Sequence, residues 1–455
     1  MRDCKRQPDE YGRRGSVANS NATEAGGEYA GHERIDMGGE SLVSSMTTRA
    51  IDANVMAAAW RWSLVVVAAA LMAPAAMADL ATQTFLERRV ASDPLDSVAL
   101  ARLSLEYVNA MRSSGNLDYL QRAQAAARGS LQAVSAARNP EGLTALAVSL
   151  YESHRFKEAL QLAQQACQID PTNQLAALLI GDAQFELGDY AAADKTYAKL
   201  AARRSGSALT TRLARLAEVR GNPDQAIALL SELTASGDDS LRVRLQLSEL
   251  YFGRGDFEQT QIQLAAAARL HPYSYAVQEH LAELRAAQGR FAEAEALYSK
   301  VIARLPRPEF MQALGDLYAL MNRAELARQW HRRAMAGYLQ STSQGNAHFY
   351  HHLANFFCDS APQLEQALRW AREDLLVRNS IFAHEGLAWA LYKNGHYQAA
   401  AQSMDRALAQ GTRSARLLFH GGMIYSGAGQ VSRGRKLLQQ AAAINPRYDT
   451  FHVHR

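Results

Sequence analysis

Small, aromatic and apolar residues recur along this chain with a period close to 34 residues. One copy of the pattern is Gly188, followed two residues later by Tyr190 and then by Ala193. The aromatic residue recurs after Gly255, Gly289 and Gly395. The turn position itself recurs at intervals of 33 or 34 residues, apart from one interval of 73, at Gly221, Gly255, Gly289, Asn322, Gly395 and Gly429. A sustained period of this length predicts one helix–turn–helix unit per repeat.

The predicted helix pairs are expected to stack on one another. Nine units have predicted first residues at Pro140, Gln174, Ser207, Leu241, Tyr275, Pro308, Ala347, Ile381 and Ala415. Pro171 and Pro272 lie where the chain should leave a second helix, because proline cannot continue one. Small residues such as Gly181 and Ala294 let the two helices approach closely. One pair cannot bury its own apolar face, so stacking must supply a continuous core.

This pattern resembles that of the tetratricopeptide-repeat (TPR) proteins. Their sequence of Leu-Gly, Tyr, Ala and Ala is most complete here at Leu314, Gly315, Tyr318, Ala327 and Ala334. The resemblance covers residues 140 to about 447. It implies an all-α fold, a right-handed α-solenoid of about nine or ten TPR helix–turn–helix repeats.

The resemblance also divides the chain. The predicted segments are a degenerate leading helical repeat (residues 79–139), repeats one to six (140–340), repeats seven to nine (347–447) and a C-terminal tail (448–455). Repeat seven departs from the pattern, because its turn at residues 358–362 carries about one extra residue. A polar linker is expected before it, at residues 341–346.

An apolar segment near the N-terminus predicts export. Residues 56–78 contain a basic start, an apolar core and the small-residue ending Ala76-Met77-Ala78, in the order of a secretory signal peptide. Cleavage is expected before Asp79, which places the mature chain in the periplasm or outside the cell. An uncleaved membrane anchor is the alternative, although the 17 residues from 62 to 78 fall short of the roughly 20 that span a bilayer. Residues 1–55 are a polar extension, interpreted as a mis-assigned start.

Charge and cysteine content narrow the possible partners. The 49 basic and 45 acidic residues are too evenly balanced for a nucleic-acid-binding protein, so no nucleic-acid partner is expected. Three cysteines, without CxxC or Cys/His zinc spacing, cannot build a disulfide framework. Cys358, near the irregular turn, is expected to be more exposed than Cys167. A bridge between them would need repeats one and seven to meet, which is not expected in an extended solenoid.

The resemblance implies that ligands bind the concave face, through positions 2, 5, 9, 12 and 13 of each first helix. The candidate groove residues are Asp182, Glu249, Glu279, Glu283 and Asp316, with an aromatic end at Trp389 and Phe419. They predict a groove for a basic or mixed extended peptide. A solvated helical face that happens to be acidic is the alternative interpretation. No repeat pairs Lys at position 5 with Asn at position 9, so a clamp for a terminal carboxylate is disfavoured.

Catalytic and metal-binding patterns are sparse. His348 and His352 stand four residues apart and could chelate a metal with His351 nearby, but no acidic partner completes the set. Packing or solvent exposure is the alternative role for these histidines. There is no GxSxG, no P-loop and no GxGxxG after a strand. No cofactor is therefore expected.

These observations predict an exported, non-catalytic TPR scaffold that binds a protein or an extended peptide in the bacterial cell envelope. Two alternatives stay open. One is a membrane-anchored component of secretion or assembly machinery, and the other is a metal-handling accessory protein acting through the histidines of repeat seven.

Overall fold

The computed structural model describes residues 81–203, 206–343 and 347–448. They belong to one compact unit, Ala75–Arg455. The predicted extension (1–55), the predicted signal peptide (56–78) and all but the first residue of the predicted tail lie outside the described residues. Among the helices described, none combines the length and hydropathy needed to span a bilayer.

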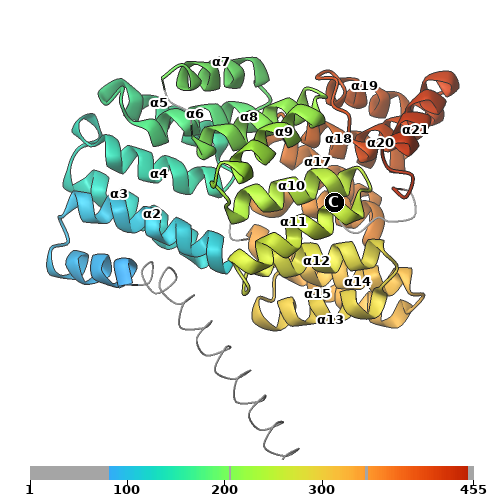
Figure 1. Ribbon diagram of the computed structural model, residues 1–455, viewed down its shortest axis with the longest axis horizontal. Helices are drawn as coiled ribbons and strands as arrows, with labels where there is room; N and C mark the ends of the chain where they lie inside the picture. Colours follow the sequence, from blue (N-terminus) through green and yellow to red (C-terminus); the bar gives the residue numbers. More distant parts are fainter. Residues whose placement is uncertain (1–80, 204–205, 344–346, 449–455) are drawn as a thin grey trace, which may run out of the picture. The chain divides into compact units, whose positions relative to one another are not determined.

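The described residues form helices joined by short turns, without strands (Figure 1). A helix over residues 81–92 precedes α2 (Ser97–Ser114), α3 (Asp118–Ala133) and the short η1 (Ala136–Arg138). The first helices of the later repeats are α4 (Pro140–Glu152), α6 (Gln174–Glu186), α8 (Ser207–Val219), α10 (Leu241–Gly253), α12 (Tyr275–Ala287), α14 (Pro308–Leu320), α18 (Ile381–Lys393) and α20 (Ala415–Gly427). Repeat seven instead begins with η2 (Ala347–Phe349), α16 (Tyr350–Asn355) and η3 (Phe356–Ser360).

The second helices are α5 (Phe156–Ile169), α7 (Tyr190–Ala201), α9 (Pro223–Ala235), α11 (Phe257–Leu270), α13 (Phe291–Arg304), α15 (Ala324–Ser343), α17 (Leu364–Val377), α19 (Tyr397–Ala407) and α21 (Val431–Ile444). Each of the nine predicted first residues is the first residue of a helix in the structure. This agreement and the uninterrupted helical content confirm an all-α solenoid.

The turn between the two helices of a repeat explains the recurring glycine. Gly188 has a φ of 78°, a left-handed conformation that glycine adopts without strain. Asp189 then caps α7, because its side chain accepts a hydrogen bond from the backbone N–H of Ala192 at 3.0 Å. The same turn position is filled by His154 in repeat one and Asn322 in repeat six, with φ of 60° and 58°.

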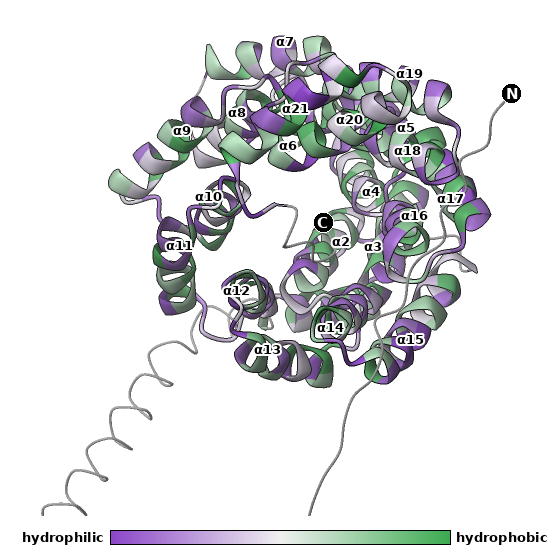
Figure 2. Ribbon diagram, turned by 90° about the vertical axis from the view of Figure 1, so that its right-hand side faces the viewer, coloured by the Kyte–Doolittle hydropathy of each residue, from purple (hydrophilic) through white to green (hydrophobic). Residues whose placement is uncertain are grey.

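First helices lie on the inside of the coil and second helices on the outside. Figure 2 shows α10, α12 and α14 inside, with α11, α13 and α15 outside them. Each first helix packs against its own second helix and against the neighbouring repeat. At Gly315 the two helices of repeat six come so close that an added Cβ would lie 2.3 Å from the His331 ring. Glycine is therefore required there by the close approach predicted from the sequence.

Repeat seven accommodates its extra residue by a change of helix type. The first helix continues from α16 into a π-helical turn over Phe356–Ser360, which holds one more residue per turn than an α-helix. The predicted linker before this repeat is partly wrong, because α15 continues to Ser343.

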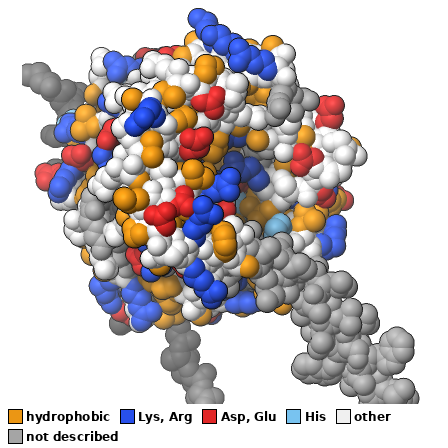
Figure 3. Space-filling model, turned by 90° about the vertical axis from the view of Figure 1, so that its left-hand side faces the viewer, with side chains coloured by type: hydrophobic (Ala, Val, Ile, Leu, Met, Phe, Trp, Pro, Cys, Tyr) orange, Lys and Arg blue, Asp and Glu red, His pale blue; other side chains and the backbone are white. Residues whose placement is uncertain are grey.

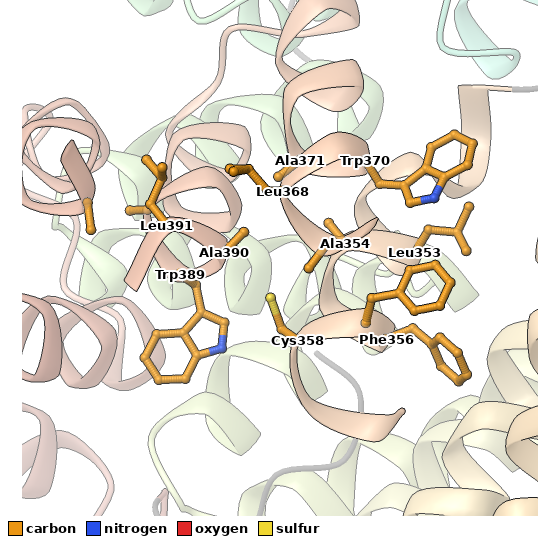
Figure 4. Packing of buried hydrophobic residues seen from close by; sticks show 14 of the residues in the cluster. Leu353, Ala354, Phe356, Cys358, Leu368, Trp370, Ala371, Trp389, Ala390 and Leu391 are labelled. Atoms are coloured by element: carbon orange, nitrogen blue, oxygen red, sulfur yellow. The ribbon is translucent and has the colours of Figure 1, made fainter. Parts of the chain in front are cut away.

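The cysteine expectation is also wrong. Cys358 is 1% exposed and lies among Ala354, Trp389 and Ala390 (Figure 4), whereas Cys167 is half-buried. Burial and the nearby Asp359 carboxylate raise the pKa of the Cys358 thiol to about 12. The side chain is therefore protonated and unreactive near neutral pH, so this thiol is compatible with an oxidising compartment.

Repeats far apart in the sequence touch one another, so the solenoid is tightly coiled rather than extended. The backbone N–H of Ile381 donates to the Tyr190 hydroxyl at 3.0 Å, and the Thr412 hydroxyl donates to the Val219 carbonyl. These pairs are 191 and 193 residues apart, which is about five and a half repeats of 34 residues.

This coiling brings repeats one and seven together, contrary to the sequence-based expectation. The rings of His154 and His348 have their centroids 4.7 Å apart. Both cysteines nevertheless remain unpaired.

Candidate functional site

Two adjoining cavities open among the first helices and beside α17. A cavity of about 200 Å³ is lined by His351, Ala354, Asn355, Ala371, Asp374, Arg378, Phe382, Ala383, Glu385, Gly386 and Arg416. A second cavity, of about 370 Å³, is lined by Glu279, Glu309, Phe310, His351, His352, Asn355 and Arg416. The two share His351, Asn355 and Arg416, so they form one continuous polar region across repeats five to nine. We call this region the inner site.

Acids of the predicted acidic strip pair with side chains of the following repeat. Asp182 accepts two hydrogen bonds from Arg212, both at 2.6 Å, and a third from the Tyr197 hydroxyl at 2.8 Å. Glu249 meets His280 of the next repeat at 3.0 Å. Each of these acids therefore has a partner about 30 residues further along the chain, and the pairs form a ladder between neighbouring first helices.

The other candidate acids are buried or already bonded. Glu279 and Glu283 are 7% and 2% exposed, and Glu279 contacts His280 at 2.9 Å. Asp316 accepts from the Ser360 hydroxyl at 3.1 Å and lies 2.8 Å from the His331 ring nitrogen. On the face drawn in Figure 3, basic and acidic side chains are interspersed. Of the candidate acids, Glu279 is the one that lines a cavity, together with Glu309 and Arg416.

The predicted aromatic end is mostly packed. Trp389 is 8% exposed, stacks on the His420 ring at 3.9 Å and donates from its indole nitrogen to Asp359 at 2.9 Å. Phe419 is half-buried, with the Tyr448 ring 5.3 Å away. Trp389 therefore belongs to the core and offers little surface to a partner, contrary to the sequence-based prediction.

The histidines of repeat seven form a packed cluster with repeat one. The rings of His351 and His352 are 3.9 Å apart, and His348 contacts both His154 and the Arg307 guanidinium. Burial, with the positive charge of Arg378 nearby, lowers the pKa of His154 to about 3. Burial likewise holds the pKa values of His348 and His351 well below their usual range. These three side chains are therefore neutral in the folded protein.

No metal site emerges from this cluster. Within the described ranges, no three His, Cys, Asp or Glu side chains converge in a metal-binding arrangement. His348, which lines neither cavity, also contacts the Arg307 guanidinium, and this disfavours a cation on that ring.

A buried ionic network supports the part of the inner site that repeats eight and nine form. Glu385, 3% exposed, accepts hydrogen bonds from Arg416 at 3.2 and 3.1 Å and pairs with the His420 ring. Burial opposes ionisation, but Arg416 and His420 lower the pKa of Glu385 to about 2. In the smaller cavity, Arg378 donates to both oxygens of Asp374 at 2.9 and 3.1 Å. These pairs hold the polar side chains of the site in fixed positions.

Sequence reasoning missed several residues of the inner site. Glu309 and Arg416 occupy position 2 of repeats six and nine, one of the positions that the family resemblance assigns to the concave face. Position 2 was therefore the sequence signal that could have identified Glu309 and Arg416 as residues of the site. Asp374 and Arg378 belong to the second half of repeat seven, which the concave positions do not include.

Comparison with known proteins identifies the class of protein to which the chain belongs. Two sequence models described as tetratricopeptide repeat match residues 150–216 and residues 245–307 and 385–449. With nine observed helix pairs in the predicted register, the chain is a tetratricopeptide-repeat protein. Such repeats generally bind protein or peptide partners, so the chain is a protein-interaction scaffold.

Solved structures with related folds are more distant. They include Cut9–Hcn1 of the APC/C (12% identity, TM-score 0.32, covering 76% of this chain and 84% of that chain). The human IFIT1 dimer with PPP-AAAA has 12% identity and a TM-score of 0.42, covering 79% and 93%. Naa15/Naa10 bound to HypK-THB has 16% identity and a TM-score of 0.26, covering 81% and 61%. At these TM-scores, nothing about partners follows. A search of curated proteins found no match.

Proposed function

We propose that this chain is an exported, non-catalytic scaffold of the cell envelope that binds an extended segment of a partner protein along the inner site. The observation that carries the proposal is the pair of adjoining cavities, which share His351, Asn355 and Arg416 on inward-facing helices. The signal-like segment at residues 56–78 supports export. The metal-handling alternative has no observation that favours it.

The inner site suits a peptide backbone with polar side chains. Its lining combines carboxylates, guanidinium groups and an amide with the aromatic rings of Phe310 and Phe382. Its charged groups are already held by ion pairs within the protein, so little side-chain freedom is lost when a partner binds. Charge complementarity then selects the partner and apolar contacts anchor it.

The test combines fractionation with capture. The full coding sequence is expressed with a tag in a bacterial host, and the product is recovered from the periplasm. Mass spectrometry then gives its mass, and the tagged protein is used to capture proteins from envelope extracts. We expect a mature chain that begins at Asp79 and a partner that is lost in Asn355→Arg. Asn355 is half-buried and lines both cavities, so the longer, charged side chain obstructs the site.

Gln439→Arg on α21 is the matched control, because Gln439 is exposed and the substitution is the same. Retention of the partner by Asn355→Arg would move binding away from the inner site. Recovery of an uncleaved chain in the membrane fraction would support the anchored alternative.

A further inference from the structure

The larger cavity of the inner site contains a buried carboxylate with unused hydrogen-bonding capacity. Glu309, the second residue of α14, is 6% exposed and pairs with Arg307 through its Oε1 atom. Its other oxygen, Oε2, is buried and accepts no hydrogen bond. A buried carboxylate oxygen without a donor is energetically costly, so a bound donor at this position would be favourable.

The charges around this carboxylate favour a cation over an anion. The two cavities are lined by four carboxylates, Glu279, Glu309, Asp374 and Glu385, but by two guanidinium groups, Arg378 and Arg416. Arg307 lies outside the lining and is paired with Glu309, so carboxylates still outnumber guanidinium groups. Both guanidinium groups are engaged, Arg378 by Asp374 and Arg416 by Glu385. An anionic group entering the cavity would therefore meet Glu279 and Glu309, while both guanidinium groups of the lining are held by carboxylates of their own.

The His351 ring adds no positive charge to the lining. His351 borders both cavities, and burial keeps its pKa well below the usual range, so the ring is neutral near pH 7. Phe310, next to Glu309 on α14, places an aromatic side chain in the cavity wall. Aromatic faces attract cations and pack against the aliphatic stems of Lys and Arg.

We propose that the larger cavity receives a basic side chain, an arginine or lysine of the bound protein segment, whose cationic N–H donors approach Glu309. The volume of about 370 Å³ is enough for one such side chain and part of its backbone. The assignment rests on the proposed function, since the basic residue belongs to a partner held at the inner site. It adds the chemistry that selects that partner.

The experiment measures binding of three blocked tripeptides to the full mature protein by calorimetry at low ionic strength. The peptides are acetyl-Ala-Arg-Ala-amide, its Gln counterpart and its Glu counterpart. We expect the Arg peptide to bind at least tenfold more tightly than the Gln peptide, because a charge-assisted hydrogen bond to a buried carboxylate is worth about tenfold or more. The Glu peptide should bind most weakly.

Variants place the effect at Glu309. Glu309→Gln should weaken the Arg peptide about tenfold, whereas Asn355→Asp, which adds a carboxylate to the same cavity, should tighten it severalfold. Glu365→Gln, an exposed acid on α17, should leave binding unchanged. Thermal melting shows whether each variant is folded, and Asn355→Asp decides the outcome if Glu309→Gln is not.

Equal binding of the Arg and Gln peptides, or insensitivity to both cavity variants, would overturn the inference. Such a result leaves the proposed function separately testable. A partner captured by Glu309→Gln but lost by Asn355→Arg would show that the inner site binds protein without selecting a basic residue.

Discussion

Replacing Arg416 by methionine should lower the free energy of unfolding by about 3 kcal/mol. Arg416 donates two hydrogen bonds to Glu385, which is 3% exposed and has a pKa lowered to about 2. Glu385 therefore stays charged at neutral pH. Without Arg416, this buried charge keeps its contact with His420 but loses both guanidinium hydrogen bonds.

Urea unfolding at pH 7 measures the loss. The matched control is Arg435→Met on α21, where the arginine is exposed and a change of no more than about 0.5 kcal/mol is expected. The double variant Glu385→Leu with Arg416→Met should recover part of the stability, because it removes the stranded charge as well as its partner. If Arg416→Met unfolds like Arg435→Met, the ionic network does not support the inner site.

Lowering the pH from 6.5 to 5 should destabilise the protein by about 3 kcal/mol through the histidine cluster. His154, with a pKa lowered to about 3, and His348 and His351, with pKa values well below the usual range, are neutral when folded. In the unfolded chain each takes up a proton below about pH 6.5. Their contribution is therefore fully present above pH 6.5 and is lost as the pH falls toward the folded pKa values.

The figure of about 1 kcal/mol per histidine is below the full value for a buried group, because these rings are half-buried and partly screened by solvent. Glu385 does not contribute in this window. Its pKa of about 2 lies below the value of an unfolded glutamate, so its stabilisation is lost only in stronger acid.

Denaturant unfolding at a series of pH values tests this dependence. The double variant His154→Asn with His351→Gln should lose roughly two thirds of the slope between pH 6.5 and 5. Asparagine suits position 154 because it tolerates the left-handed turn, as Asn322 does in repeat six. His271→Asn, at an exposed position after α11, is the control. A slope unchanged by the double variant would mean that the cluster is already protonated or exposed in the folded protein.

The sequence was sufficient to predict the repeats because their determinants are local. Gly188 and its equivalents mark the turns, and small residues such as Gly315 mark the close helix contacts. The nine helix starts followed from the period and the family pattern together, since repeat seven begins 39 residues after repeat six. The extra residue of repeat seven was visible as an irregular spacing, but its accommodation as a π-helical turn depends on packing that spacing does not describe.

The inner site was harder to predict because its partners lie in other repeats. Asp182 and Glu249 looked like a free acidic strip, yet their bases are about 30 residues away. The contact between His154 and His348 depends on how tightly the solenoid coils, which the period of a single repeat does not determine. The repeat positions of the concave face therefore identified inward-facing residues from the sequence. The charge pairing and the burial of these residues could be seen only in the structure.

Site-specific photocrosslinking in living cells tests most directly whether the inner site binds a partner. A photoreactive phenylalanine analogue replaces Asn355, inside the site, or Gln439, exposed on α21, in otherwise identical chains. The proposed function predicts a crosslinked protein adduct from position 355 and none from position 439. An adduct from position 439 with none from position 355 would contradict it and place the interaction surface on the outside of the solenoid.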